Sequence, residues 1–200
     1  MTARDAARPG GRSARVQASV HGAVRTLLAR AGRDQLTIPQ IAAEAGVTPS
    51  TIYRRWGDLQ ELLGDVAVEH LRPDADPPDA GSLAADLFAW GEQYAEEMAS
   101  APGRALIRDV MASRPEDAGR CCAYTRQQLS VIAGRARRRG EPVPSVETMI
   151  DHVVAPIMYR ILFDADPVTA GRVRDLVARL MQACTGSGQE TPEITEISSR

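Results

Sequence analysis

Hydroxyl, phenol and guanidinium groups are concentrated in one short stretch of the sequence, residues 48–55. The groups belong to Thr48, Ser50, Thr51, Tyr53, Arg54 and Arg55. Hydroxyls and phenols donate and accept hydrogen bonds, whereas arginine contacts phosphates and the edge of guanine. The major groove of DNA admits an α-helix whose side chains reach both kinds of target. The chemistry that this stretch predicts is therefore recognition of DNA.

The rest of the sequence offers little catalytic or metal-binding chemistry. It contains no Gly-rich phosphate loop, no H-E-x-x-H and no G-x-S-x-G. Three histidines supply few general bases, and the spacing of the three cysteines fits neither a zinc site nor a disulfide framework. For Cys121 and Cys122 an inert buried role is favoured over oxidant sensing. We therefore expect no enzyme activity, no cofactor and no metal.

Two short helices joined by a tight turn are predicted to position the groups of residues 48–55. The first helix begins at Thr37, which forms a capping box with Gln40. It ends at Gly46, where glycine permits a left-handed backbone conformation. The second helix begins with Thr48 as N-cap and Pro49 as its first helical residue. This arrangement is a helix-turn-helix.

The outer side of the second helix is predicted to face DNA. Ile52 points back at Ala42 of the first helix, where a small side chain permits close approach. The alternative is an ordinary helical hairpin with a solvated basic face, but the turn, cap and basic residues occur together in register. The predicted DNA-contacting residues are Thr37, Thr48, Pro49, Ser50, Thr51, Tyr53, Arg54 and Arg55.

Residues 37–63 resemble the N-terminal domain of TetR/AcrR-type transcriptional repressors, whose pattern is T-x-x-x-I-A-x-x-A-G-V-[ST]-x-x-T-[LIV]-Y-x-[HYR]-F-x-[SDN]-K-x-x-L. The matching residues are Thr37, Ile41, Ala42, Ala45, Gly46, Val47, Thr48, Thr51, Ile52, Tyr53, Arg55 and Leu62. Trp56 stands where the family usually has Phe, which preserves an aromatic side chain. Leu59 stands where the family commonly has a phosphate-contacting lysine, and Arg54 or Arg55 is the candidate to compensate.

The chain shows no strand-like alternation and no repeat, which predicts an all-α fold of about nine helices. The resemblance implies an N-terminal helix-turn-helix domain and a C-terminal helical bundle. It also implies a ligand-responsive repressor that binds a palindromic operator as a homodimer and is released by a small-molecule effector. The implied effector cavity lies within residues 82–160. Candidate lining residues are Trp90, Tyr94, Met98, Met111, Cys122, Tyr124, Met149, His152 and Tyr159. Methionine and aromatic residues at helical spacing are equally typical of a plain core.

The last two predicted helices, residues 145–164 and 167–184, are rich in apolar side chains. A helix that is apolar on two sides is buried against two surfaces, here its own core and, as the resemblance implies, a partner subunit. An entirely intramolecular core is the alternative. Pro156 is expected to disturb the first of these helices. The predicted interface residues are Ile150, Val154, Ile157, Ile161, Val173, Leu176, Val177 and Leu180.

Charge divides the chain into two parts, although the 200 residues carry a net charge of only −2. Residues 1–57 hold nine Arg against Asp5, Asp34 and Glu44, a formal charge of +6, and the remainder carries −8. This asymmetry indicates a nucleic-acid-facing N-terminus and a separate acidic body. The cluster from Arg135 to Arg139 is expected to be a solvated helix end.

The predicted organisation has four parts. Residues 1–12 form a basic arm, 13–57 the DNA-binding domain, 58–184 a linker helix with the ligand-binding and dimerisation domain, and 185–200 a disordered tail. Helices are expected near 13–31, 59–71, 82–100, 103–113 and 115–139 as well. The absence of an 18-residue apolar run and of a secretory h-region predicts a cytoplasmic protein. The competing function is a dimeric helical interaction protein with a degenerate hairpin.

Overall fold

The computed structural model describes residues 11–164 and 166–186, and every regular element among them is helical. Helix α8 (Val146–Met149) continues through a π-helical turn (Ile150–Val154) into α9 (Ala155–Phe163), so the described residues form nine continuous helices, and the predicted all-α fold is confirmed. None of the described helices is both long and apolar enough to cross a membrane. Most of the predicted arm and tail, residues 1–10 and 187–200, lies outside the described residues.

The chain divides into two compact units. The first unit comprises Met1–Arg72 and Leu106–Cys121, and the second comprises Pro73–Ala105 and Cys122–Arg200. The predicted boundary at residue 58 differs from this division. The reason is that Leu62, Leu63 and Val66 of the next helix are buried in the same core as the helix-turn-helix.

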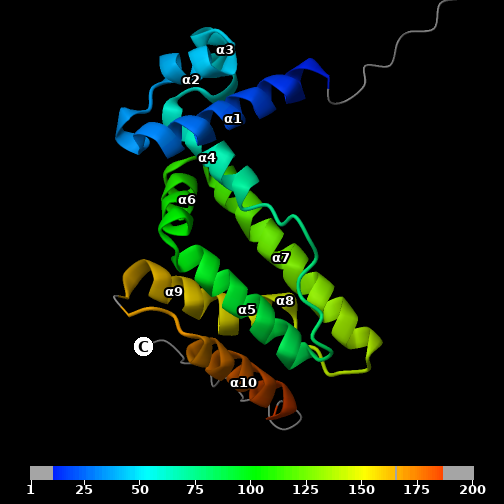
Figure 1. The fold of residues 1–200 in the computed structure, drawn as a ribbon. Coiled ribbons are helices and arrows are strands. Elements are labelled where there is room, and N and C mark those ends of the chain that lie inside the picture. Colours follow the sequence, from blue (N-terminus) through cyan, green and yellow to red (C-terminus); the bar gives the residue numbers. More distant parts are fainter. Residues whose placement is uncertain (1–10, 165, 187–200) are drawn as a thin grey trace, which may run out of the picture. The chain divides into compact units, whose positions relative to one another are not determined.

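The first unit is built from α1 (Arg12–Ala31), α2 (Ile38–Ala45), α3 (Pro49–Trp56) and α4 (Leu59–His70), with a 3₁₀ turn at Arg33–Gln35. Helix α1 packs against α2 and α4, and α3 packs against α2 and α4 (Figure 1). Fully buried apolar side chains from all four helices form one core: Val20, Val24, Ile41, Ala42, Ile52 and Leu62. The predicted proximity of Ile52 and Ala42 agrees with their places in this core.

The first unit also contains the end of α6 (Ala101–Ala112) and the start of α7 (Pro115–Arg138). Gly64 of α4 permits this packing, because a Cβ atom at Gly64 would lie only 2.2 Å from the Cβ of Ser113. Ion pairs reinforce it: Arg114 Nε lies 2.7 Å from Glu61 Oε2, and Arg33 pairs with Asp109. The segment 106–121 is therefore attached to α4 by both close packing and charge.

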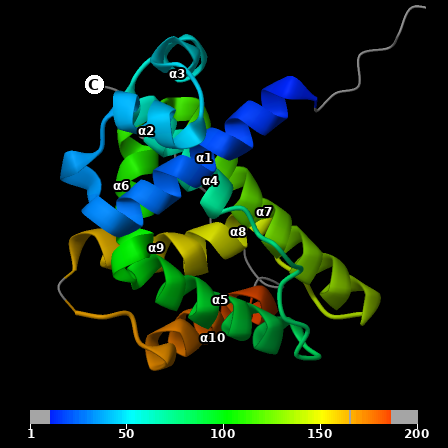
Figure 2. The ribbon, with the colours of Figure 1, turned by 45° about the horizontal axis from the view of Figure 1, so that its top comes forward.

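The second unit centres on α5 (Leu83–Ala99), which packs against α9 and α10 (Ala170–Gly186), as the two views in Figures 1 and 2 show. Gly91 of α5 permits close approach to α10, because an added Cβ would lie 2.9 Å from Val173 Cγ1. The disturbance predicted near Pro156 is also present. The N–H of Ala155 donates to the carbonyl of Ile150, five residues earlier, which defines the π turn just before the proline.

Two arginines of the cluster from Arg135 to Arg139 are not freely solvated, so the expectation was wrong for Arg135 and Arg139. Arg135 donates to the carbonyl of Pro77 at 2.6 Å, and Arg139 donates to the fully buried carboxylate of Asp86 at 2.8 Å. The Pro77 contact, together with an ion pair between Arg139 and Asp79, fixes the loop between α4 and α5 to the end of α7. Sequence composition correctly predicts the loop, but not the ion pairs that hold it.

Candidate nucleic-acid interface

Helix α2, which leads into the turn before α3, has a well-formed start at Thr37. The backbone N–H of Gln40 donates to Thr37 Oγ1, and the backbone N–H of Thr37 donates to Gln40 Oε1, at 3.4 and 3.0 Å. This reciprocal pair is the predicted capping box. The Thr37 hydroxyl is therefore engaged in capping α2, although the side chain remains exposed.

The turn itself uses Gly46, whose φ of 66° and ψ of 33° lie in the left-handed region. The predicted role of this glycine is therefore confirmed. Thr48 and Pro49 occupy the predicted N-cap and first helical positions of α3. However, the Thr48 side chain makes no capping bond, and its Oγ1 lies instead 2.9 Å from Ser50 Oγ and 3.0 Å from Thr51 Oγ1.

Helix α3 has one buried side and one exposed side. Ile52 and Trp56 are buried in the core of the first unit. Pro49, Ser50, Tyr53 and the two arginines are exposed, and Tyr53 keeps half of its surface accessible. The outer side of α3 therefore presents five of the eight predicted DNA contacts, with Thr51 half-buried at its edge, whereas Thr48 precedes α3 and Thr37 lies at the start of α2.

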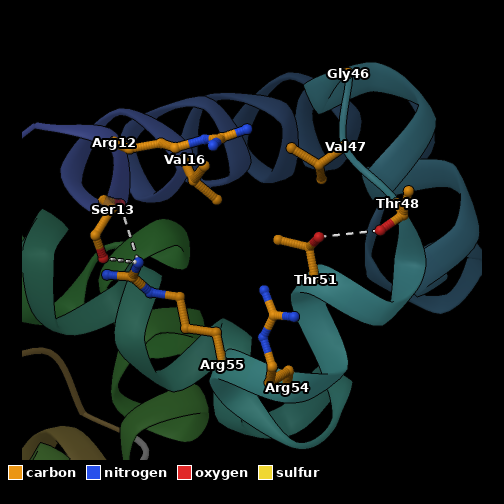
Figure 3. A pocket seen from close by; sticks show the side chains of 9 residues that line it. All are labelled: Arg12, Ser13, Val16, Gly46, Val47, Thr48, Thr51, Arg54 and Arg55. Carbon is orange, nitrogen blue, oxygen red and sulfur yellow. Dashed lines mark hydrogen bonds between the residues drawn. The ribbon is translucent and has the colours of Figure 1, made fainter.

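A hollow of about 1070 Å³ lies between the start of α1, the α2–α3 turn and α3 (Figure 3). Its lining residues are Arg12, Ser13, Val16, Gly46, Val47, Thr48, Thr51, Arg54 and Arg55. Four predicted DNA contacts thus meet in one place. Of the α1 residues, Arg12 was predicted as the end of a basic arm, whereas Ser13 and Val16 were not predicted as part of the site.

The two arginines of α3 have different surroundings. Arg55 donates through Nη1 to the carbonyl and hydroxyl oxygens of Ser13, at 2.9 and 2.7 Å, and through Nη2 to Gln17 Oε1 at 2.5 Å. Its guanidinium also lies 5.0 Å from the ring centre of Trp56. Within the described part of the chain the Arg54 side chain has no hydrogen bond or ion pair, and Figure 3 shows it directed towards the hollow. Arg54 is therefore the available cation of α3.

A buried carboxylate lies behind α3. Asp65 of α4 is 7% exposed and receives a hydrogen bond of 2.8 Å from Trp56 Nε1 and one of 2.7 Å from Arg120. His21 Nε2 lies 3.0 Å from the same carboxylate. Burial raises the pKa of Asp65, but the hydrogen bonds from His21, Trp56 and Arg120 outweigh it and hold the pKa far below its ordinary value. Asp65 is therefore ionised, and no sequence signal pointed to it.

Leu59 is partly buried against the core of the first unit. A phosphate-contacting lysine is therefore replaced here by an apolar packing residue of α4. Because Arg55 is occupied by Ser13 and Gln17, Arg54 is the better placed of the two arginines to supply the missing charge.

The predicted effector residues do not share one environment. Met149, Trp90 and Met98 are buried, and Tyr94 and Tyr124 are half-buried. Trp90 and Tyr94 stack with ring centres 5.0 Å apart. The remaining four are exposed, so they do not line an enclosed cavity in this structure: Met111, Cys122, His152 and Tyr159. Met111 moreover belongs to the first unit.

Seven of the eight predicted dimer residues are buried within the chain itself, and Ile150 is half-buried. The buried residues are Val154, Ile157, Ile161, Val173, Leu176, Val177 and Leu180. Their apolar periodicity reflects packing inside the second unit. The apolar side chains that α9 leaves exposed are Tyr159, Leu162 and Phe163, and the rings of Tyr159 and Phe163 lie 5.3 Å apart.

Comparison with known proteins gives matches over both units. Residues 22–66 match the family "Bacterial regulatory proteins, tetR family", and residues 77–180 match "Tetracyclin repressor-like, C-terminal domain". The HTH-type transcriptional regulator YdeS of Bacillus subtilis is 27% identical over 168 residues, covering 80% of this chain and 84% of that protein. AqdR of Rhodococcus erythropolis, also an HTH-type transcriptional regulator, is 29% identical over 144 residues, covering 70% of each.

A solved structure is similar as well. The crystal structure of the TetR family transcription regulator SCO0332 superimposes with a TM-score of 0.61 at 28% identity. The match covers 84% of this chain and 97% of that one.

Proposed function

Because the chain belongs to the TetR family of bacterial transcriptional regulators, we propose that it is a repressor that binds a palindromic operator as a homodimer. Proteins of this family regulate transcription by binding DNA and are not enzymes. A small-molecule effector, bound in the second unit, releases the repressor from its operator. The coupling free energy of such linked sites is typically about 1–3 kcal/mol.

The observation that best supports the predicted DNA-contacting residues is that the Arg54 side chain has no partner within the described residues. Its guanidinium is unpaired within the described residues and faces a hollow that Arg12 lines from the opposite side. A hollow with a cation on each wall and threonine hydroxyls between them suits a phosphate of the DNA backbone. Exposed Ser50 and Tyr53 then lie on the same helix for contacts to base edges.

The dimer uses the apolar side chains that α9 leaves uncovered. Tyr159, Leu162 and Phe163 are all exposed, and two of them form a ring pair. Large exposed apolar side chains close together are typical of surfaces that bind another protein. An interface between identical subunits related by a two-fold axis matches a palindromic operator with half-sites about one helical turn apart.

The effector site is proposed around the stacked pair of Trp90 and Tyr94 on α5. Trp90 is buried and Tyr94 half-buried, so an aromatic surface lies near the interior of the second unit. Aromatic and apolar side chains dominate the lining of small-molecule sites. Met98 and Met149 are the other predicted lining residues that the fold keeps in the interior.

Selection of bound fragments from genomic DNA, followed by footprinting, tests the proposal. We expect a protected palindrome for the wild type and its loss for Tyr53→Ala/Arg54→Ala with the helical circular dichroism spectrum unchanged. The exposed Met111→Ala variant serves as a control that keeps the footprint. Retention of the footprint by the double variant would refute α3 as the reading helix.

The effector is tested by adding a panel of apolar and aromatic small molecules to the footprinted complex. A compound that releases the wild type and not a Tyr94→Ala variant supports the site on α5. If release is unchanged in Tyr94→Ala, the effector binds elsewhere.

A further inference from the structure

The buried carboxylate of Asp65 accepts hydrogen bonds from side chains of three other helices of the first unit. Its Oδ2 accepts hydrogen bonds from Gln17 Nε2 of α1 at 3.3 Å and from Trp56 Nε1 of α3 at 2.8 Å. Its Oδ1 accepts from Arg120 of α7 at 2.7 Å. An ionised carboxylate only accepts hydrogen bonds, so every partner must present a donor to it, which makes Nε2 of His21 the protonated nitrogen.

The carboxylate determines which way the amide of Gln17 points. A glutamine amide has one donor end and one acceptor end. Asp65 takes the donor end, so Oε1 is left facing the guanidinium of Arg55, 2.5 Å away. The reverse orientation would place the amide oxygen against the carboxylate and the amide nitrogen against the guanidinium. Both contacts would then be repulsive, so one orientation is strongly preferred.

Trp56 provides a second connection between Asp65 and Arg55. The indole N–H is held by the carboxylate, and the guanidinium of Arg55 lies 5.0 Å from the centre of the same ring. A guanidinium over an indole is attracted to its electron-rich face. Asp65 therefore fixes both the amide and the ring that Arg55 contacts.

Arg55 in turn connects α3 to the first turn of α1 through both oxygens of Ser13. The hollow that Arg54 and Arg12 face has these two elements as its walls. The spacing of its cations therefore depends on the Arg55 contacts, which depend on Gln17 and Trp56.

We propose that Asp65 is a positioning residue for DNA binding, acting through Gln17 and Trp56 on Arg55. Arg55 is then a structural cation that sets α3 against α1, and Arg54 is the cation that meets DNA. The proposal rests on the proposed function in that α3 reads the operator. It assigns to the carboxylate a role in specificity, because displaced reading groups lose base contacts before they lose general attraction to the backbone.

The test compares affinity for a selected operator with affinity for a random duplex at one salt concentration. Gln17→Leu and Arg55→Gln are each expected to lower the ratio of the two affinities about tenfold. The double variant is expected to lower it no further, because the effects of residues in one hydrogen-bond network are not additive. Arg120→Gln is the matched control. It removes a different donor from the same carboxylate, outside the path to Arg55, and is expected to leave the ratio within about twofold.

Two results would overturn the proposal. One is an additive loss in the double variant, and the other is an equal loss of the ratio in Arg120→Gln. A merely structural role would lower both affinities together, in proportion to the folded fraction measured by urea unfolding.

A readout on the free protein keeps the test separate from the proposed function. The chain has only two tryptophans, so the Trp56 indole N–H is readily assigned in a ¹⁵N spectrum of the full chain. In the wild type we expect slow solvent exchange of this proton and signals that show a restricted Arg55 guanidinium. In Gln17→Leu we expect the signals to show that the Arg55 guanidinium has become mobile. If no operator is found although these signals are as expected, the proposed function is refuted and the contacts of Arg55 are not. Unchanged Arg55 signals in Gln17→Leu would refute the path through Gln17.

Discussion

Trp56 Nε1 donates a hydrogen bond of 2.8 Å to Asp65 Oδ2, joining the last residue of α3 to the buried side of α4. Both side chains are almost completely buried. The family pattern usually has phenylalanine at the position of Trp56, and a phenyl ring carries no donor for a carboxylate. In this chain the aromatic residue therefore fills the core, and its N–H offsets part of the free-energy cost of burying the Asp65 charge.

Replacing Trp56 by phenylalanine isolates that second role. Trp56→Phe keeps an apolar ring in the core but removes one donor from the Asp65 carboxylate. We expect the free energy of unfolding to fall by about 1–3 kcal/mol, as for other losses of a buried partner of a charged group. Urea denaturation measures the change. In an Asp65→Asn background the same substitution is expected to cost less, and an equal cost in both backgrounds would contradict the coupling.

The depressed pKa of Asp65 predicts a dependence of stability on acid. Because the pKa is lower in the folded chain than the value of about 3.9 expected when unfolded, ionised Asp65 stabilises folding above that value. The stabilisation is lost as the pH falls below it. We expect the free energy of unfolding to decrease from about pH 5 downwards.

Comparison with Trp56→Phe separates Asp65 from the other carboxylates. Loss of a hydrogen bond brings the folded pKa closer to the unfolded one, so the variant is expected to lose less stability than the wild type between pH 5 and 2. Parallel pH profiles for the two proteins would show that Trp56 does not hold the charge of Asp65.

Local sequence codes predicted much of the helix-turn-helix. The capping box of Thr37 and Gln40 involves residues three positions apart, and the left-handed turn depends on Gly46 alone. The Asp65 network was not predictable in this way. Gln17 and Asp65 are 48 positions apart, and neither residue type indicates that the two side chains form a hydrogen bond.

The dimer residues show another limit of periodicity. Apolar spacing correctly placed Ile157 and Ile161 on one side of a helix, but it did not distinguish a side that faces the chain's own core from one that faces a partner. The exposed Phe163 and Leu162 are apolar too, so only the packing of α9 against α5 shows which side is covered.

Thr37 and Thr48 are expected to respond differently to the same substitution. Thr37→Ala removes a side-chain cap and is expected to destabilise the chain by about 1 kcal/mol. Thr48→Ala occupies the equivalent position of α3 but removes no capping bond, so the expected loss is a few tenths of a kcal/mol. Thermal or urea unfolding of the two variants compares them directly. Equal losses would mean that the Thr48 hydroxyl caps α3 in solution.

The unequal surroundings of Arg54 and Arg55 predict unequal effects on the salt dependence of DNA binding. Each phosphate contact contributes about 0.9 to the slope of log affinity against log salt concentration. For a dimer, Arg54→Gln is therefore expected to reduce the magnitude of the slope by about 1.8. Arg55→Gln is expected to leave the slope unchanged while lowering operator affinity, and fluorescence anisotropy titrations over a range of salt concentrations measure both. A reduced slope for Arg55→Gln would assign it a phosphate contact.

Charge placed on the uncovered side of α9 is expected to separate the subunits. Phe163 is 74% exposed and lies beside Tyr159, so a glutamate there does not disturb the core of the second unit. In a two-fold dimer the same position occurs on both subunits, and Phe163→Glu would bring unpaired carboxylates into an apolar contact. Sedimentation velocity is expected to show a monomer for Phe163→Glu and a dimer for Met111→Glu, whose site is equally exposed but belongs to the first unit. The monomer is expected to bind a single half-site and to lose the gain in affinity that two linked half-sites provide. If Phe163→Glu remains dimeric, the subunits meet through another surface.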